Sequence, residues 1–157
     1  MKKLILTVAL GLATSFGAFA QGEFNLANGA PGVDAPISDS NGALIADTGF
    51  WIQAYTGAGA DAGSLAPLGT PFRAATGVPG YFFPGATAVP GSASGETVTV
   101  QIAAWSDNVT SYEAAIATPG SEAGLSNPVN IVLAGGTTPL NDLVGLNAFS
   151  LSVIPIP

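Results

Sequence analysis

The sequence contains no cysteine and no histidine, and these two absences remove several classes of chemistry. Without cysteine there is no disulfide, so the fold must be stabilised by its hydrophobic core. Without histidine, the usual base of a nucleophilic triad is missing and zinc loses a preferred ligand. Only carboxylate chemistry remains, and we expect the protein not to be an enzyme.

Positive charge is also scarce, with three Lys and Arg residues against ten Asp and Glu. Lys2 and Lys3 lie at the N-terminus, so the rest of the chain has one cation, Arg73, and a net charge of −9. A basic patch that neutralises phosphates is excluded, and nucleic acid is not an expected partner. An anionic membrane surface is excluded for the same reason.

The N-terminal segment has the features of a secretory signal. Lys2 and Lys3 precede an apolar run over residues 4–16, and Ala18 and Ala20 form a small-x-small site for signal peptidase. The apolar run is short for a membrane span, and no stable span is expected in the mature chain. We therefore expect residues 1–20 to be a helical signal peptide and residues 21–157 to be one secreted or cell-surface domain.

The clearest structural pattern lies between residues 96 and 117. Val98, Val100, Ile102 and Ala104 alternate with other residues, which predicts a strand with one buried face. A turn at residues 106–108 and one helical turn at 112–115 should follow.

Several weaker patterns complete the predicted architecture. Residues 48–56 predict a central strand, or one partly covered by a loop, because both faces carry large side chains. Residues 57–71 are rich in Gly, Ala and Pro and predict a loop. Further predicted segments are a strand at 21–28, a strand or aromatic plug within 72–83, and strands at 127–134 and 146–154. Roughly seven to nine short strands indicate an all-β fold, either an antiparallel β-sandwich or a jelly roll.

Four aromatic residues are the candidate ligand contacts. Trp51, Tyr55, Trp105 and Tyr112 could form a platform on which a sugar ring stacks. Aromatic residues of a sandwich more commonly belong to its core. A carbohydrate-binding module that uses these residues is the alternative function that the sequence allows.

Acidic residues suggest two further sites. Asp39, Asn41 and Asp47 lie near one turn and could bind calcium, but they lack the full spacing of a calcium loop, and an ordinary Asx turn is the simpler interpretation. Asp107 and Glu113 flank another turn and are candidates for a glycosidase pair. Turn formation by Asp107 and a helix-turn role for Glu113 are the simpler interpretation, so we assign no catalytic, cofactor or metal residue.

The order of features resembles one family of exported proteins. The matching pieces are residues 24–28, 52–55, 98–105 and 111–115, Gly135-Gly136 with Pro139, residues 146–151, and Pro155-Ile156-Pro157. In this order they are similar to small PEP-CTERM proteins of Verrucomicrobia and Planctomycetes. That resemblance implies roles in the extracellular matrix, the surface layer or biofilm.

The sorting tail of that family does not occur in this sequence. A Pro-Glu-Pro motif, a membrane helix and a basic cluster would be expected after Pro157, so the resemblance implies processing by an exosortase only if such a tail follows.

The two terminal strands suggest a second kind of partner. Both are short, uncharged and apolar on alternate residues, so each could pair with another copy of the chain or with the other terminus. The main expectation is therefore an exported structural protein of the cell surface or matrix, able to assemble through edge strands. Its expected partners are itself or an extracellular polysaccharide.

Overall fold

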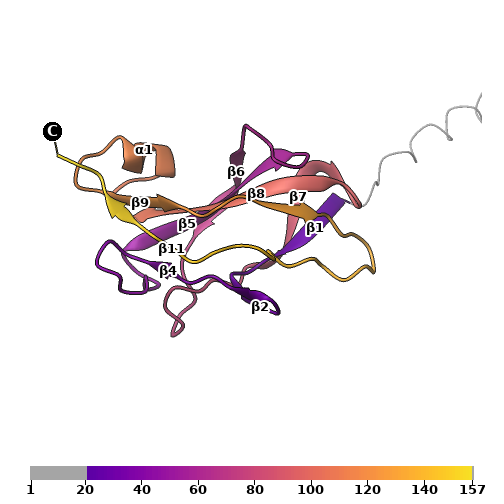
Figure 1. Ribbon diagram of the computed structural model, residues 1–157, viewed down its shortest axis with the longest axis horizontal. Helices are drawn as coiled ribbons and strands as arrows, with labels where there is room; N and C mark the ends of the chain where they lie inside the picture. Colours follow the sequence, from indigo (N-terminus) through magenta and orange to yellow (C-terminus); the bar gives the residue numbers. More distant parts are fainter. Residues whose placement is uncertain (1–20, 157) are drawn as a thin grey trace, which may run out of the picture.

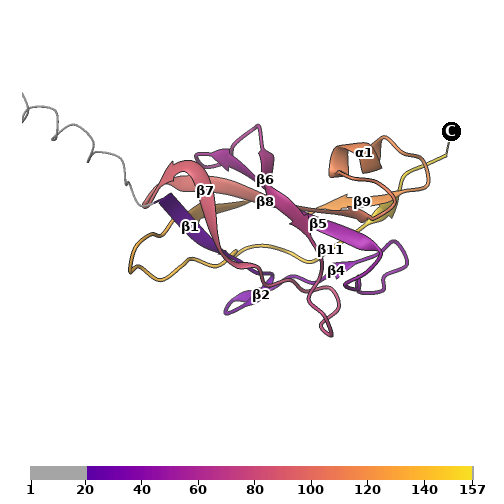
Figure 2. The same ribbon diagram turned by 180° about the vertical axis from the view of Figure 1, so that it is seen from behind.

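One antiparallel sheet forms the main layer of the fold, as Figure 1 and Figure 2 show from opposite sides. The computed structural model describes residues 21–156. The strand order in this sheet is β12-β9-β8-β5-β6, and β10 also pairs with β8. The six strands are β5 (Phe50–Ala58), β6 (Ala66–Phe72), β8 (Thr97–Ser106), β9 (Glu122–Leu125), β10 (Val129–Val132) and β12 (Ser152–Val153).

Shorter pieces of sheet cover one face of this layer (Figure 1). They are three strand pairs, and the pair β4–β11 is parallel. The strands are β1 (Gln21–Leu26) with β7 (Gly85–Ala93), β2 (Gly29–Ala30) with β3 (Val33–Asp34), and β4 (Ile37–Ser38) with β11 (Phe149–Ser150). The helix α1 (Tyr112–Ile116) lies on the opposite face of the main sheet.

The prediction of an all-β, sandwich-type fold is confirmed. Residues 21–156 contain twelve strands instead of seven to nine, because five of the twelve are only two residues long. In the same part of the chain, no helix is long and apolar enough to span a membrane. The predicted signal peptide, with Ala18 and Ala20, lies outside the described residues.

The inner core fills the space between the main sheet and the covering strands. From β8 it receives Val98, Val100, Ile102 and Ala104, each at most 1% exposed. This is the apolar face that alternation predicts. The inner core is largely aliphatic and draws residues from both layers; its other buried members are Phe24, Leu26, Val33, Ala35, Ile37, Ile45, Ile52, Ala54, Leu68, Ala74, Phe82, Val89, Val129, Ile131, Leu133, Leu143, Leu146 and Leu151.

A second, smaller apolar group lies on the other face of the sheet, beneath α1. This outer cluster consists of buried Tyr55, Ala103, Trp105, Ala115 and Ala123, against which Trp51, Leu65, Val109, Tyr112 and Ile154 pack. The prediction that β8 buries one face is therefore wrong, because the helix covers its second face. The predicted central position of β5, between β8 and β6, is confirmed.

Two sequence predictions fail where pairing overrides local pattern. Residues 57–71 were expected to be a loop, yet β5 continues to Ala58 and β6 begins at Ala66. Residues 146–154 were expected to be one strand, yet only β11 and β12 form there. Leu146 and Leu151 are both buried although they are an odd number of residues apart, so the chain cannot keep one strict alternation.

The terminal strands pair with other segments instead of with each other. β1 pairs with β7 and makes a bridge from Glu23 to Ala134, with both N···O distances 2.8 Å. β12 pairs with β9.

A serine joins β9 and β10, which lie end to end along β8. The Ser126 backbone N–H donates to the Ile102 carbonyl at 2.8 Å, and the Ile102 N–H donates to Ser126 Oγ at 2.9 Å. The Ser126 carbonyl accepts from Gln101 Nε2 at 2.7 Å. A hydroxyl thus takes the place of a backbone carbonyl in the ladder, and β8 keeps its hydrogen bonds across the junction.

Candidate functional site

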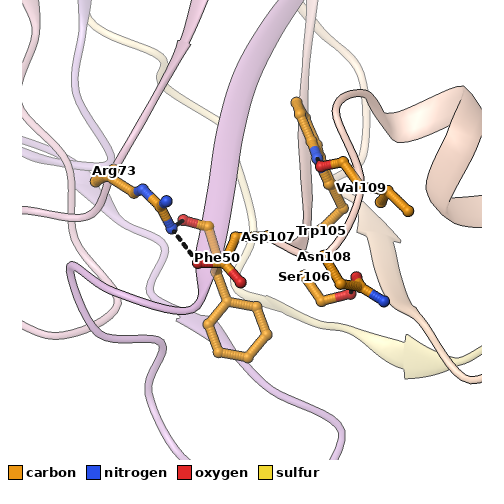
Figure 3. A network of polar contacts seen from close by, with 7 residues as sticks. All are labelled: Phe50, Arg73, Trp105, Ser106, Asp107, Asn108 and Val109. Atoms are coloured by element: carbon orange, nitrogen blue, oxygen red, sulfur yellow. Dashed lines mark hydrogen bonds and ion pairs between the residues drawn. The ribbon is translucent and has the colours of Figure 1, made fainter.

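The two tryptophans of the predicted platform have structural positions. Trp105 is 0% exposed, and its indole N–H donates to the Val109 carbonyl at 3.2 Å (Figure 3). Trp51 is covered by Arg73, whose guanidinium carbon lies 3.6 Å from the centroid of the indole. Trp105 therefore cannot belong to an exposed platform, and its burial fits the core role that is more common for aromatic residues of a sandwich.

Arg73 makes polar contacts with two other segments at that end of the sheet. Its Nη1 donates to the Phe50 carbonyl at 2.7 Å and to Asp107 Oδ2 at 3.2 Å (Figure 3). It thereby ties the segment after β6 to the start of β5 and to the turn after β8.

The two predicted tyrosines do come together. Tyr55 on β5 and Tyr112 at the start of α1 have ring centroids 6.4 Å apart with an interplanar angle of 72°. The Tyr55 hydroxyl donates to Glu113 Oε1 at 2.8 Å. Two rings and a carboxylate therefore meet on the outer face of the sheet.

An open pocket of about 360 Å³ lies beside this pair, and we call it the tyrosine pocket. Its wall and floor come from β5, the β5–β6 loop, β8, α1, the end of β9, and the chain between β9 and β10. The lining residues are Tyr55, Ala62, Gly63, Leu65, Gln101, Tyr112, Glu113, Leu125 and Pro128.

The first turn of α1 is held in place by local capping. Ser111 is the N-cap residue, and its hydroxyl accepts a hydrogen bond from the Ala114 N–H at 3.1 Å. At the other end, Thr118 Oγ1 donates to the Ala114 carbonyl at 2.8 Å. Pro119 and Gly120 prevent the helix from continuing. This short helix places Tyr112 and Glu113 above the sheet.

The loop wall of the pocket is clamped to the sheet. Asn130 Nδ2 donates to Asp61 Oδ1 at 2.9 Å, and the Asp61 N–H donates to Asn130 Oδ1 at 3.0 Å. The Ala62 N–H donates to Thr99 Oγ1 at 2.9 Å. Asp61 has a φ of 53°, a conformation that costs free energy outside glycine, so these contacts hold the loop in one shape.

The pocket is electrostatically negative. The backbone N–H of Glu113 and the Tyr55 hydroxyl hold the pKa of the Glu113 carboxyl below its usual range. Burial, and then the charge of Glu113, raise the pKa of Tyr112. No Lys or Arg is among the lining residues, so Glu113 is ionised near neutral pH without a cationic neighbour in the pocket.

The remaining acidic candidates are used within the fold. Asp39 Oδ1 accepts from the N–H groups of Asn41 and Ala43, both at 2.9 Å, which confirms the Asx turn. Asp107 pairs with Arg73 and Glu113 with Tyr55, so each member of the suggested glycosidase pair has its own local partner. Residues 21–156 contain no group of three or more His, Cys, Asp or Glu side chains arranged to hold a metal ion.

A second aromatic pair lies in the segment expected to be a strand or aromatic plug, and sequence reasoning did not identify its two members as a surface pair. Tyr81 and Phe83 have parallel rings, with an interplanar angle of 5° and centroids 6.5 Å apart, and Phe83 is 50% exposed. Both rings lie against Gly29, where an added Cβ would be 2.9 Å from Tyr81. The Tyr81 hydroxyl donates to Asp34 Oδ1 at 2.6 Å. The spacing of two aromatics at i and i+2 was the available signal.

Comparisons with protein-family models, curated proteins and solved structures find no match for this chain. The arrangement of its own residues is therefore the basis for inferring function.

Proposed function

We propose that this chain is an exported, non-enzymatic protein of the cell surface or extracellular matrix that binds a polysaccharide at the tyrosine pocket. The observation that supports this most strongly is the meeting of two tyrosine rings with an amide and a carboxylate in one open pocket. A concave, mostly apolar surface with a few convergent polar groups is the usual form of a small-ligand site.

Each part of the pocket has a use in binding a sugar. The Tyr112 ring offers an apolar face for the C–H side of a pyranose ring. The Gln101 amide nitrogen donates to the Ser126 carbonyl. The amide oxygen can therefore accept a hydrogen bond from a sugar hydroxyl. Glu113 provides a second acceptor, and charge-assisted hydrogen bonds of this kind are the stronger ones.

Assembly through edge strands receives less support. One edge strand of the main sheet, β6, contains Pro67 and Pro71, and β7 contains Pro90. Proline cannot donate a ladder hydrogen bond and is a common protection of exposed edges. Polysaccharide binding is therefore the function that we favour over self-assembly.

Export and surface location remain part of the proposal through the signal-like N-terminus and the PEP-CTERM resemblance. Intact-mass measurement of the protein recovered from the medium should give a chain that begins at Gln21. A chain that retains residues 1–20 in the medium would contradict this part of the proposal.

Polysaccharide binding can be tested by affinity electrophoresis and calorimetry of the mature chain with a panel of bacterial and plant polysaccharides. The Tyr112→Ala variant should lose binding about tenfold or more, because it removes the stacking face. Phe83→Ala is the matched control, since it removes an exposed aromatic from the other pair. Loss of binding in Phe83→Ala but not in Tyr112→Ala would place the binding site at the Tyr81–Phe83 pair. The absence of binding to every polysaccharide of the panel would overturn the proposal.

A further inference from the structure

We infer that the tyrosine pocket selects a protonated amino sugar, such as a deacetylated hexosamine unit, over a neutral sugar of the same size. This inference rests on the proposed function, and it names the class of polysaccharide that the pocket takes. It follows from the arrangement of the two rings and the carboxylate, from the absence of any cationic lining residue, and from the charge of the whole chain.

The geometry suits an ammonium group. The Tyr55 and Tyr112 rings stand at 72° to each other, so they form two walls of a corner instead of one flat platform. Glu113 Oε1 is 2.8 Å from the Tyr55 hydroxyl, which places the carboxylate at the edge of that corner. A cation within about 6 Å of an aromatic ring is attracted to its face, and a carboxylate beside it adds a direct ion pair.

The charge of the pocket has no internal compensation. The one cation among residues 21–156, Arg73, is committed to Trp51, Phe50 and Asp107. Tyr55 is only 8% exposed, so its side of the corner is closed to water.

The chain as a whole adds to this preference. Its net charge without the first 20 residues is −9, from Arg73 and ten carboxylates. Such a field attracts polycations and repels uronic acid polymers, and it thereby contributes selectivity by repulsion as well as by attraction.

The remaining lining groups distinguish an amino sugar from a bare amine. The Gln101 amide oxygen and the Tyr112 hydroxyl can bond to sugar hydroxyls, and Leu65 and Leu125 line the pocket with apolar surface. A lysine side chain offers the ammonium group but no hydroxyls for these partners. We therefore assign the ligand as a saccharide.

Calorimetry with three hexasaccharides of equal length tests the inference. They are the fully deacetylated glucosamine oligomer, its N-acetylated form and the neutral glucose oligomer, all measured at a mildly acidic pH where the amine is protonated. The deacetylated oligomer should bind about tenfold more tightly than the neutral one, and added salt should reduce this difference.

Two charge-matched variants separate a local effect from a general one. Glu113→Gln should abolish the preference for the deacetylated oligomer over the neutral one, measured as the ratio of the two affinities, although both affinities should fall because the charge-assisted hydrogen bond is lost. Asp47→Asn removes the same charge outside the lining residues and should keep the preference.

Each other outcome has a distinct meaning. Equal affinity for the three oligomers, or binding to none of them while a polysaccharide of the panel binds, would overturn the inference and leave the proposed function in place. Binding to none of the oligomers and to no polysaccharide of the panel would overturn the proposed function too. Loss of preference in both Glu113→Gln and Asp47→Asn would show a non-local charge effect and overturn the inference. A lysine hexapeptide that binds as tightly as the amino sugar would overturn the assignment of a saccharide.

Discussion

The two faces of the main sheet follow different rules although the same strands supply both. On the inner face, β8 contributes four small aliphatic side chains to a core shared with nearly every other strand. On the outer face, the alternate residues of β8 and β5 contribute Trp105 and Tyr55 to a cluster of five buried residues under a five-residue helix. The inner face therefore determines stability, while the outer face is shallow enough to leave a pocket with aromatic walls.

The sharpest way to test this division is to truncate the inner core. Phe24 is 0% exposed, so Phe24→Ala should lower the free energy of unfolding by about 3–5 kcal/mol and leave much of the protein unfolded. Urea denaturation followed by tryptophan fluorescence measures this. Val132→Ala, at a side chain 50% exposed, should change the free energy by less than about 0.5 kcal/mol, and a similar loss in both variants would contradict the division.

A buried polar residue tests whether the inner layer also depends on hydrogen bonds. Asn28 is 0% exposed; its Nδ2 donates to the carbonyls of Ala35 and Gly80 at 2.8 and 2.9 Å, and its Oδ1 accepts from the Phe82 N–H at 2.7 Å. Asn28→Ala should cost about 3 kcal/mol, because it leaves buried backbone groups unpaired. The same denaturation assay gives the value, and a cost under about 1 kcal/mol would show that water replaces the side chain.

On the outer face the balance should reverse. Tyr112 is half-buried at the edge of the outer cluster, so Tyr112→Ala should cost about 1 kcal/mol of stability while it removes binding at the pocket. Denaturation and calorimetry on the same sample compare the two effects. A large loss of stability with unchanged binding would assign Tyr112 to the core instead of to the site.

Arg73 offers a smaller test at the exposed end of the same face. Its side chain and that of Asp107 are 29% and 43% exposed, so solvent screens their ion pair. Arg73→Met should cost about 1 kcal/mol, mostly through the lost contact with Trp51. The cost should change little between low and high salt; a strong dependence on salt would mean that the ion pair dominates.

The smallest expected effect is the pH dependence from Glu113. Its folded-state pKa is lower than in the unfolded chain, so its contribution to stability is present above the unfolded value and is lost as the pH falls through the folded one. Wild type should therefore lose more stability than Glu113→Gln between about pH 5 and pH 2. Parallel curves for the two proteins in urea titrations would contradict this role.

The sequence predicts an element well where the residues of that element determine its structure, and poorly where pairing with a distant segment determines it. β5, β8, β10 and the turn of α1 could be predicted because their own alternation and capping residues determine them. β6 could not, because Pro67, Gly69 and Pro71 resemble a loop and only pairing with β5 makes this segment a strand.

The site was predictable only in part for the same reason. Tyr55 and Tyr112 were identified by residue type, but the pocket also needs Leu65, Gln101 and Leu125, which lie far apart in the sequence. The burial of Trp105 follows from the position of α1, and strand alternation alone does not reveal that position.

The serine at the junction of β9 and β10 has a consequence for amide exchange. The Ile102 amide, in the middle of the longest strand, is bonded to the side-chain hydroxyl of Ser126. Replacing that one oxygen, as in Ser126→Ala, should selectively hasten hydrogen–deuterium exchange at Ile102 while its neighbours on β8 stay slow. Gln101 also bonds to Ser126 and lines the tyrosine pocket. The exchange rate of the Ile102 amide would therefore report on the hydrogen bonds that lie directly below the pocket.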